Sequence, residues 1–366
     1  MKPFIYLRSL RRVEHTVFSV QEGQKFYRDP IFNTLQAYAS GQQVKRCIMD
    51  SVTTELGVSP APITFNWKVT KKGKKSKTGE NTANDGIEFE SKEAWSPCNP
   101  AYVDQLIGGY MRAQTGESVI KRRSPLSVSA MRPVHPLLGG MEKEKENLTF
   151  DRTSHPDLHP VRVTDDSGEE LSPAELSMLL AKTKRNLPNR LWVPDNTRVS
   201  GLFANDVCID LRTLFCVSMN QREPEMTLNT IAELKEAGWI ESKNVFGACL
   251  VAPKAKRDAY IDALAEALIG WRITSNQART FSLMETIAVA ISTNPDRLAT
   301  SIRGELRDDV EYNSAKLVIS KDAGADVFVS PLVSGIIKGE KGEANALYAA
   351  EQQLVKMMKA YDYENQ

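Results

Sequence analysis

The histidines are the first candidates for catalysis or metal binding, and they are few. The chain of 366 residues has four histidines, three of which fall between residues 132 and 197. The segment His155-Pro156-Asp157-Leu158-His159 sets two imidazoles and a carboxylate close together, a donor set that a transition metal can use. However, a proline follows each of the three histidines and favours an extended backbone there, and the sequence supplies no further ligand. We therefore expect loop histidines, and no metal site.

Signatures of nucleotide binding and of nucleophilic catalysis are missing from the sequence. There is no G-x-x-x-x-G-K-[ST] loop, no G-x-G-x-x-G between a strand and a helix, and no G-x-S-x-G elbow. The glycine-rich segment 335–342 carries two lysines and leads into a helix, so its backbone amides could face a phosphate. A surface turn is the simpler interpretation, and we expect no cofactor.

Cysteine usage and hydropathy indicate the cellular environment. The five cysteines are scattered, odd in number and without a C-x-x-C pair, so neither a disulfide framework nor a zinc site is indicated. No apolar run approaches the roughly 20 residues that span a bilayer, and the start of the chain has only residues 4–7 as an apolar stretch. We therefore expect a cytoplasmic protein with no membrane contact.

Residues 40–46 have the composition of a phosphate-binding site. They read Ser40-Gly41-Gln42-Gln43-Val44-Lys45-Arg46, at the start of a predicted helix. Free backbone N–H groups and the positive end of the helix dipole favour an anion at this place. Ser40 and Gln42 can bond to ribose or phosphate oxygens, and the two cations add charge. An ordinary solvated helix end would have the same composition, so the segment alone leaves both interpretations open.

Two further clusters combine cations with aromatic or amide side chains. The first contains Tyr110, Met111 and Arg112 and, farther along the chain, Lys121, Arg122 and Arg123, which together offer a stacking surface beside positive charge. The second is the polar loop 275–280, with Asn276, Gln277 and Arg279. A polar surface loop is the alternative for the second cluster.

Charge is distributed unevenly although the net charge is only +1. Residues 1–80 hold 14 basic and six acidic side chains, a net charge of +8, whereas residues 151–180 hold seven acidic side chains and two arginines. A basic surface can hold a polyanion while acidic surfaces contact other proteins. A solvated mixed surface is the alternative.

Strand and helix patterns interleave along the chain. Strands are predicted over residues 4–20, 63–69, 87–95, 122–131, 199–217, 245–252, 281–291, 316–320 and 326–329, with a short helical turn included in 199–217. Helices are predicted over 44–56, 99–114, 254–269 and 343–361. The loop between residues 71 and 85 is rich in Lys, Gly and Asn, and we expect a basic tip there. This order predicts an α+β fold around a mainly antiparallel sheet.

Residues 132–197 interrupt this pattern. The stretch contains seven prolines and one predicted helix, 173–184, which Ser172 can cap. It is too long for an ordinary loop. We therefore expect an inserted subdomain.

Taken in order, these segments resemble those of the guide-RNA-binding backbone subunit of CRISPR-associated effector complexes, a RAMP superfamily protein. The resemblance covers about residues 4–295. The segments that carry it are 40–46, 104–113 (Asp-Gln-Leu-Ile-Gly-Gly-Tyr-Met-Arg-Ala), 127–135 (Ser-Val-Ser-Ala-Met-Arg-Pro-Val-His), 199–214 and 273–281. Two positions depart from the family pattern: Tyr110 stands where many members carry arginine, and Ser275 begins a loop that starts with glycine-lysine in the family.

The resemblance implies a fold and a division of the chain. It implies a modified RRM-like (ferredoxin-like) palm from residues 1–132 and 198–366, with an antiparallel sheet and finger-like elements around a loop at about residues 68–85. The inserted residues 133–197 would form a thumb. Copies of the protein would stack along the spacer of a CRISPR RNA, each thumb folding over the neighbouring segment. The bases would then be presented for pairing with target DNA or RNA, which delegates sequence specificity to the guide.

The resemblance also implies a set of contacts. Other subunits of the effector complex would be partners, and no membrane would be involved. The expected RNA contacts are Ser40, Gln42, Gln43, Lys45, Arg46, Arg8, Arg11, Arg12, Tyr110, Met111, Arg112, Arg122, Arg123, Arg132, Asn276, Gln277 and Arg279. The finger lysines are expected to capture the target strand more than the guide: Lys71, Lys72, Lys74, Lys75 and Lys77.

Three alternatives remain open at this point. Related proteins cleave CRISPR precursor RNA by metal-independent acid/base chemistry, for which His15 and Tyr6 are the candidates here. Related backbone subunits cut target RNA with an acidic side chain and a metal, and we find no such acid in this sequence. A scaffold that binds no nucleic acid is the third alternative.

Overall fold

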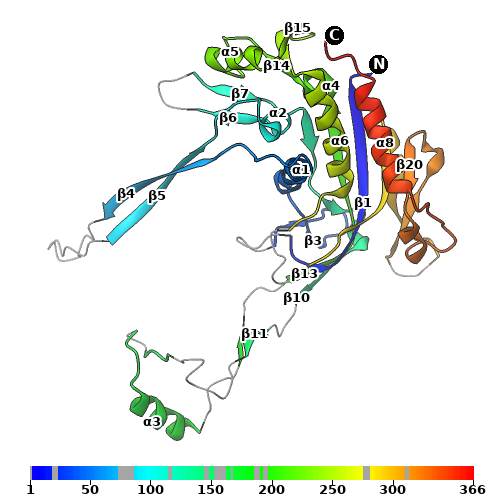
Figure 1. The fold of residues 1–366 in the computed structure, drawn as a ribbon. Coiled ribbons are helices and arrows are strands. Elements are labelled where there is room, and N and C mark those ends of the chain that lie inside the picture. The colour runs from blue at the N-terminus through cyan, green and yellow to red at the C-terminus, as the bar shows by residue number, and fades with distance from the viewer. Residues whose placement is uncertain are drawn as a thin grey trace. The chain divides into compact units, whose positions relative to one another are not determined.

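The structure is a computed structural model that describes residues 2–18, 24–72, 86–113, 118–143, 148–151, 162–165, 168–184, 190–192, 197–274, 281–309 and 313–366. The chain divides into two compact units. The first contains Met1–Gly140 and Ser200–Gln366, and the second Met141–Val199. The first unit holds the main sheet and its helices (Figure 1).

The main sheet runs in the order β10-β13-β1-β17-β20, and two short strands, β8 and β9, also pair with β13. The pairs β1–β17, β17–β20, β13–β8 and β13–β9 are antiparallel. The strands are β1 (Phe4–Thr16), β8 (Leu126–Val128), β9 (Arg132–Pro133), β10 (Gly139–Lys143), β13 (Thr197–Asp210), β17 (Glu285–Ser292) and β20 (Asp326–Val329). Strand β17 is buried along nearly its whole length, as expected for a central strand covered on both faces.

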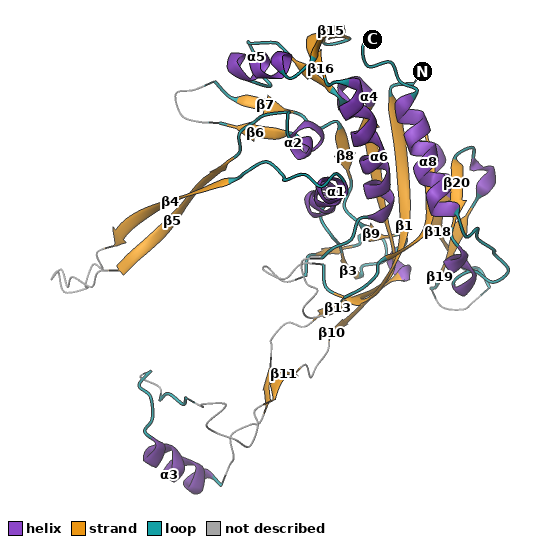
Figure 2. Ribbon diagram, in the orientation of Figure 1, coloured by secondary structure: helices purple, strands orange, loops and turns teal. Residues whose placement is uncertain are grey.

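Three long helices pack in a row against the sheet, with α6 in contact with both α1 and α8 (Figure 2). They are α1 (Gly41–Glu55), α6 (Lys254–Gly270) and α8 (Ala346–Lys359). Their buried residues recur at helical spacing, for example Ile261, Leu264 and Leu268 in α6. Ser40 caps α1, because its hydroxyl accepts a hydrogen bond from the Gln43 N–H at 3.3 Å.

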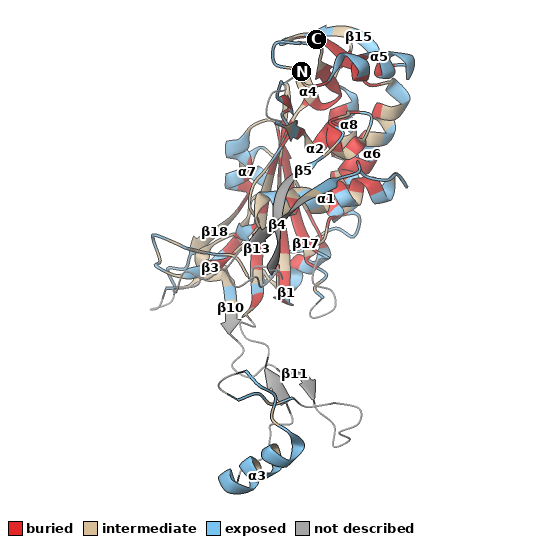
Figure 3. Ribbon diagram, turned by 90° about the vertical axis from the view of Figure 1, so that its left-hand side faces the viewer, coloured by how far each residue is buried: buried red, intermediate tan, exposed pale blue. Residues whose placement is uncertain are grey.

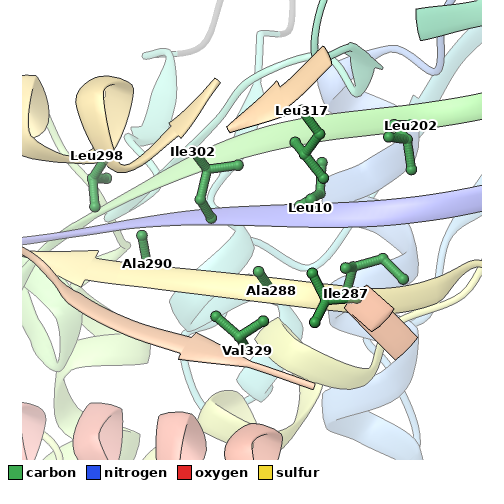
Figure 4. Close-up of a cluster of buried hydrophobic side chains, with 10 residues drawn as sticks. Leu10, Leu202, Ile287, Ala288, Ala290, Leu298, Ile302, Leu317 and Val329 are labelled. Atoms are coloured by element: carbon green, nitrogen blue, oxygen red, sulfur yellow. The ribbon is translucent and has the colours of Figure 1, made fainter. Parts of the chain in front are cut away.

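A separate apolar cluster joins β1 and β17 to α7 (Pro295–Ser301) and to the hairpin of β18 (Ile302–Leu306) and β19 (Ala315–Ile319). Figure 4 shows Leu10, Ile302 and Leu317 pointing into this cluster. Leu10 and Arg11 are neighbours at an irregularity in the β1–β17 register. Leu10 belongs to this cluster, whereas Arg11 bonds to the end of α6.

The remaining elements of the first unit are short. One small antiparallel sheet runs in the order β14-β16-β15, with α5 against β16. Its elements are β14 (Cys216–Ser218), β15 (Ile240–Asn244), β16 (Gly247–Val251), α4 (Leu211–Leu214) and α5 (Leu228–Glu236). Three two-stranded hairpins accompany it: β2 (Phe26–Arg28) with β3 (Leu35–Ala37), β4 (Thr64–Lys72) with β5 (Gly86–Trp95), and β6 (Tyr110–Arg112) with β7 (Ile120–Arg122). Helix α2 (Val103–Gly108) and the 3-10 helices η1 (Pro136–Leu138), η2 (Lys321–Ala323) and η3 (Pro331–Gly335) complete the unit.

The second unit contains little buried surface in its described part. Strands β11 (Leu148–Asp151) and β12 (Arg190–Trp192) pair antiparallel, and α3 (Pro173–Thr183) has no buried residue (Figure 3). Ser172 and Glu175 form a reciprocal capping box at the start of α3. The predicted helix at 173–184 is therefore present and begins at its expected cap.

The structure confirms a mixed α/β fold with antiparallel sheets. Helix α2 spans only Val103–Gly108, so the helix predicted over residues 99–114 is wrong before residue 103 and beyond residue 108. The helix ends where Gly109 adopts a positive φ of 78°. Residues 110–112 then form β6. The strand predicted over residues 122–131 is divided in the structure, since β7 ends at Arg122 and β8 spans only Leu126–Val128. No helix in the described part of the chain is both long enough and apolar enough to cross a membrane.

Candidate nucleic-acid interface

The start of α1 opens into a pocket of about 350 Å³. Four residues from the predicted phosphate-binding segment line it: Ser40, Gly41, Gln42 and Lys45. The opposite wall comes from Val128 and Ala130, at the end of β8 and just after it. The first backbone N–H groups of α1, the helix dipole and a lysine therefore meet at one hollow that an anion can enter.

Lys45 is half-buried, and burial lowers the pKa of its ammonium group. Lys45 forms no ion pair with any described residue, so an anion bound in the pocket would offset the cost of burying its charge. Arg46, by contrast, is 83% exposed and lies 3.8 Å from Asp50. Such an exposed pair is weak, and the arginine remains available to a ligand.

Gly41 and Gln43 hold the first turn of α1 in place. A Cβ atom at Gly41 would lie 2.4 Å from the Val128 carbonyl oxygen, so only glycine allows this approach of the helix to β8. The Gln43 side chain donates a hydrogen bond to the carbonyl of Phe18, just beyond β1. Gln43 was predicted as an RNA contact, and in the structure its amide binds the protein.

The two halves of the Tyr110–Arg123 cluster come together as the β6–β7 hairpin. Its register pairs Tyr110 with Arg122 and Met111 with Lys121. Met111 is exposed, and so are Lys121 and Arg123. An apolar side chain, Met111, therefore lies beside cations on one side of this hairpin, but the predicted aromatic stacking surface is not there, because Tyr110 is buried.

Arg122 and Tyr110 lie on the buried side of the same hairpin. The Arg122 guanidinium donates hydrogen bonds to the carbonyls of Leu106, Cys216 and Thr213. Burial raises the pKa of the Tyr110 phenol above its ordinary value. Both side chains belong to the protein interior, and we exclude them from the interface.

The arginines of β1 are engaged with the protein in three different ways. Arg11 is fully buried and donates to the carbonyls of Ile269, Trp271 and Met284. Arg8 forms a bidentate ion pair with Asp206, with distances of 2.7 and 3.0 Å. Arg12 pairs with Glu14 near the surface. We exclude Arg11 from the interface, because no ligand can reach it.

Of the other predicted contacts, some are described by the structure and some are not. Arg112 is half-buried and Arg132 is exposed. Asn276, Gln277 and Arg279 lie outside the described residues, as do Lys74, Lys75 and Lys77 of the finger loop. The segment that holds Asn276, Gln277 and Arg279 lies between Trp271 and Met284 in the sequence. Arg11 donates a hydrogen bond to the main-chain carbonyl of each of these two flanking residues.

No cluster of three or more metal-ligating side chains occurs among the residues that the structure describes. His155, Asp157 and His159 lie outside them. His135 is described, and its Nδ1 accepts a hydrogen bond from the Leu137 N–H at 3.1 Å while its ring lies edge-on to Phe32. Burial lowers the pKa of His135. This histidine caps η1.

His15 and Tyr6 do not form a single site. Both lie on β1, nine residues apart, which corresponds to roughly 30 Å along a strand. Tyr6 contacts Cys208 of β13. A general acid and a general base must both reach the same phosphodiester, and this pair cannot.

The sequence interpretation missed residues that reach an interface from distant parts of the chain. Val128 and Ala130 complete the pocket at α1, and Arg222 and Phe246 line a further groove with Arg123. Arg222 and Phe246 belong to none of the motifs identified in the sequence. Val128 and Ala130 lie in the segment 127–135, but they were not predicted as contacts. Only the pairing of strands brings them to the predicted residues.

Comparison with known proteins gives a structural likeness and no sequence match. No family model matches the chain, and no curated protein matches it. One similar solved structure is a chain of a CRISPR RNA-guided surveillance complex in a pre-nicking state, with a TM-score of 0.43, 12% identity, and coverage of 97% of this chain and 88% of that one. A second, from a CRISPR RNA-guided surveillance complex, has a TM-score of 0.38, 10% identity, and coverage of 97% and 84%. These values are too low to carry a functional argument, so the function of this chain has to come from its own residues.

Proposed function

We propose that this protein is a CRISPR RNA-binding backbone subunit of a multisubunit surveillance complex. The observation that carries the proposal is the pocket at α1, where Ser40, Gln42 and the half-buried Lys45 face one hollow. Helix N–H groups, an amide and an ammonium are the groups that hold a phosphodiester without reading its sequence. The ordered series of segments that resembles this family supports the same function.

The proposed assembly follows from that role. Copies of the chain would bind successive segments of the guide and form a helical filament with other effector subunits. The residues of the RRM-like palm would hold the backbone, and residues 133–197 would act as the thumb. Target DNA or RNA would then pair with the bases that the filament leaves accessible.

We propose that the chain is not itself a nuclease. The separation of Tyr6 and His15 along β1 supports this, since the two side chains cannot act on one phosphate. A phosphate-binding pocket without an acid/base pair retains RNA and does not cut it.

The salt dependence of RNA binding tests the pocket. If Lys45 and Arg46 each neutralise one phosphate, their replacement together by alanine lowers the slope of log affinity against log salt by about 1.4–1.8, at roughly 0.7–0.9 per phosphate. Fluorescence anisotropy with a labelled single-stranded RNA measures the slope. The matched control is Lys341→Ala with Lys356→Ala, two exposed lysines that lie outside the pocket. An unchanged slope in the Lys45 and Arg46 variant contradicts the assignment.

A further inference from the structure

A second groove, of about 950 Å³, lies where β7 meets the segment that connects β14 to α5. The turn between β15 and β16, with Phe246, forms another wall. The groove shares no lining residue with the pocket at α1. It is therefore a separate site, and the guide-binding role proposed above does not require it.

The groove has an excess of uncommitted positive charge. Lys121, Arg123 and Arg222 are exposed on its walls, and none of them forms an ion pair with a described residue. Two of the three acids in the lining are already engaged. Asp210 binds Arg212 through two contacts of 2.8 Å, and Glu225 binds the buried Arg122 at 3.0 Å.

Glu225 also accepts a hydrogen bond from the Ser218 N–H at 2.9 Å, so its carboxylate is bound both by a guanidinium and by the main chain. This leaves Glu223 as the one acid in the described lining without an ion pair, against three free cations. An array of this kind attracts a ligand that carries several negative charges.

An exposed aromatic ring lines the same groove. Phe246 is 62% exposed, and both its main chain and its ring have contacts. Its N–H donates to the Asn244 side chain at 2.9 Å, and that buried asparagine in turn donates to the Arg212 carbonyl. The Arg212 guanidinium lies 4.9 Å from the Phe246 ring and 4.7 Å from the Phe4 ring. An exposed ring next to a cation is the arrangement on which an unpaired base stacks.

We propose that this groove binds a segment of single-stranded nucleic acid, with phosphates at Lys121, Arg123 and Arg222 and a base on Phe246. The contacts with phosphate and with a ring face carry no sequence code, so the groove accepts any sequence. RNA and single-stranded DNA share this chemistry, and both are ligands of the proposed class.

Strand β8 connects the groove to the pocket at α1. Ser124 lines the groove and Val128 lines the pocket, four residues apart, or roughly 13 Å in an extended chain. A single strand that covers this distance can occupy both sites.

An acidic segment of a partner protein is the competing ligand. A protein segment of that kind gains its affinity chiefly from apolar or aromatic anchors buried in closed pockets. The two large apolar side chains of the groove, Val119 and Phe246, are 48% and 62% exposed. The other apolar members of the lining are small: Pro224 is half-buried, and Cys216 is buried in the protein. The lining therefore fits a flexible polyanion that stacks better than it fits an anchored peptide.

Photo-crosslinking locates the bound strand directly. Protein freed of bound nucleic acid by high salt is irradiated with oligouridylate that carries 5-iodouridine, and with the matching oligodeoxyuridylate. Trypsin releases residues 244–254 as one peptide, because Lys243 and Lys254 flank Phe246. We expect an adduct on this peptide that disappears in Phe246→Ala. Absence of the adduct with both oligonucleotides overturns the proposal.

Salt titrations separate this groove from the pocket at α1. Replacing Arg123 and Arg222 together by alanine should lower the salt slope for single strands by about 1.4, and Lys341→Ala with Lys356→Ala should leave it unchanged. If only the Lys45 and Arg46 variant loses slope, the groove proposal fails and the guide-binding proposal stands. If the salt slope falls only in the groove variant, the assignment of guide binding to the pocket at α1 fails and the groove proposal stands. A groove variant that keeps its RNA affinity but loses binding of a labelled oligoglutamate peptide assigns the groove to a protein partner and overturns the proposal.

Discussion

Arginine side chains in this protein serve two distinct purposes. Arg11 and Arg122 are buried, and each donates to main-chain carbonyls from several segments, which a planar fork of five N–H donors can do and an ammonium cannot. Arg46 and Arg123 are exposed and available to a ligand. The residue type alone indicates positive charge, and only burial decides whether the charge supports the fold or binds a partner.

His135 should make the stability of the protein depend on pH. In the folded chain its Nδ1 accepts a hydrogen bond from Leu137, and burial holds its pKa below the ordinary value. The unfolded chain therefore takes up a proton first as the pH falls. Stability contributed by neutral His135 is complete above a pH of about 6.5 and is lost progressively below it. We expect Tm to fall between about pH 7.5 and about pH 5.5, measured by differential scanning calorimetry.

His135→Asn is the matched variant for this measurement. Asparagine can accept the same hydrogen bond as the cap of η1 but does not titrate. The decrease in Tm over that pH range should be smaller in His135→Asn than in the parent protein. An identical decrease in both proteins would show that His135 is not the titrating group.

At the scale of elements, Arg11 joins β1 to the end of α6 and to the start of β17. Its Nη1 donates to the carbonyls of Trp271 and Met284, its Nη2 donates to the carbonyl of Ile269, and the guanidinium lies 4.2 Å from the Trp271 ring. Arg11→Lys leaves buried carbonyls without donors and should lower the free energy of unfolding by about 2–4 kcal/mol.

Urea denaturation followed by tryptophan fluorescence measures the effect of Arg11→Lys. The control is Arg12→Lys, at the neighbouring and partly exposed position, which should stay within about 0.5 kcal/mol of the parent. If the two variants were equally stable, the hydrogen bonds of the buried Arg11 guanidinium would contribute nothing to the packing of α6.

Gly41 sets the distance between α1 and β8. In Gly41→Ala the new methyl group would meet the Val128 carbonyl at 2.4 Å, so the first turn of the helix has to shift. We expect a loss of stability of about 1–3 kcal/mol, as for other overpacked sites. Affinity for single-stranded RNA should fall as well, since the shift deforms the pocket.

Gly270→Ala provides the comparison for Gly41→Ala. Gly270 ends α6, and nothing lies within 4 Å of a Cβ atom built there. This variant should be neutral or more stable by up to about 1 kcal/mol. If Gly41→Ala binds RNA as tightly as the parent protein, the pocket at α1 is not the RNA-binding site.

Periodic segments were predictable from the sequence, and segments defined by distant contacts were not. The helix predicted over 254–269 is α6, and the strand predicted over 326–329 is β20, because their residue types and spacing are local features of the sequence. The predictions contained neither β2 nor α7, which are short and depend on tertiary contacts. The end of α2 was misplaced because a single glycine conformation decides it.

The same distinction holds for the candidate interface. Ser40, Gln42 and Lys45 were predicted together because a helix start is a local feature with its own residue preferences. Burial of Tyr110 and Arg122 could not be predicted, since the side of a hairpin that faces the core is set by its packing partners. Arg222 and Phe246 join the groove only through the small sheet.

At the scale of the whole molecule, the first unit should fold without the second. The apolar cluster around Leu10 and the helices α1, α6 and α8 belong to the first unit. Residues on either side of the second unit approach closely, since a Cβ atom at Gly201 would lie 2.9 Å from the Gly139 Cα atom. Strands β10 and β13 are neighbours, so a tight turn can join them.

Replacement of residues 144–196 by Asn-Gly tests this independence. We expect a single cooperative unfolding transition in calorimetry and retained binding of a short RNA oligonucleotide. Large assemblies on long RNA should be lost, because the proposed thumb is absent. A shortened protein that unfolds without cooperativity would contradict the independence of the first unit.

The most direct test of the proposed function is purification of the protein under native conditions. The absorbance ratio at 260 and 280 nm and the size of the particles are measured before and after ribonuclease treatment. Guide binding predicts a high ratio, RNA in the preparation, and large assemblies that collapse to monomers when the RNA is digested. A monomer free of nucleic acid that also fails to bind added guide RNA would contradict the proposed function.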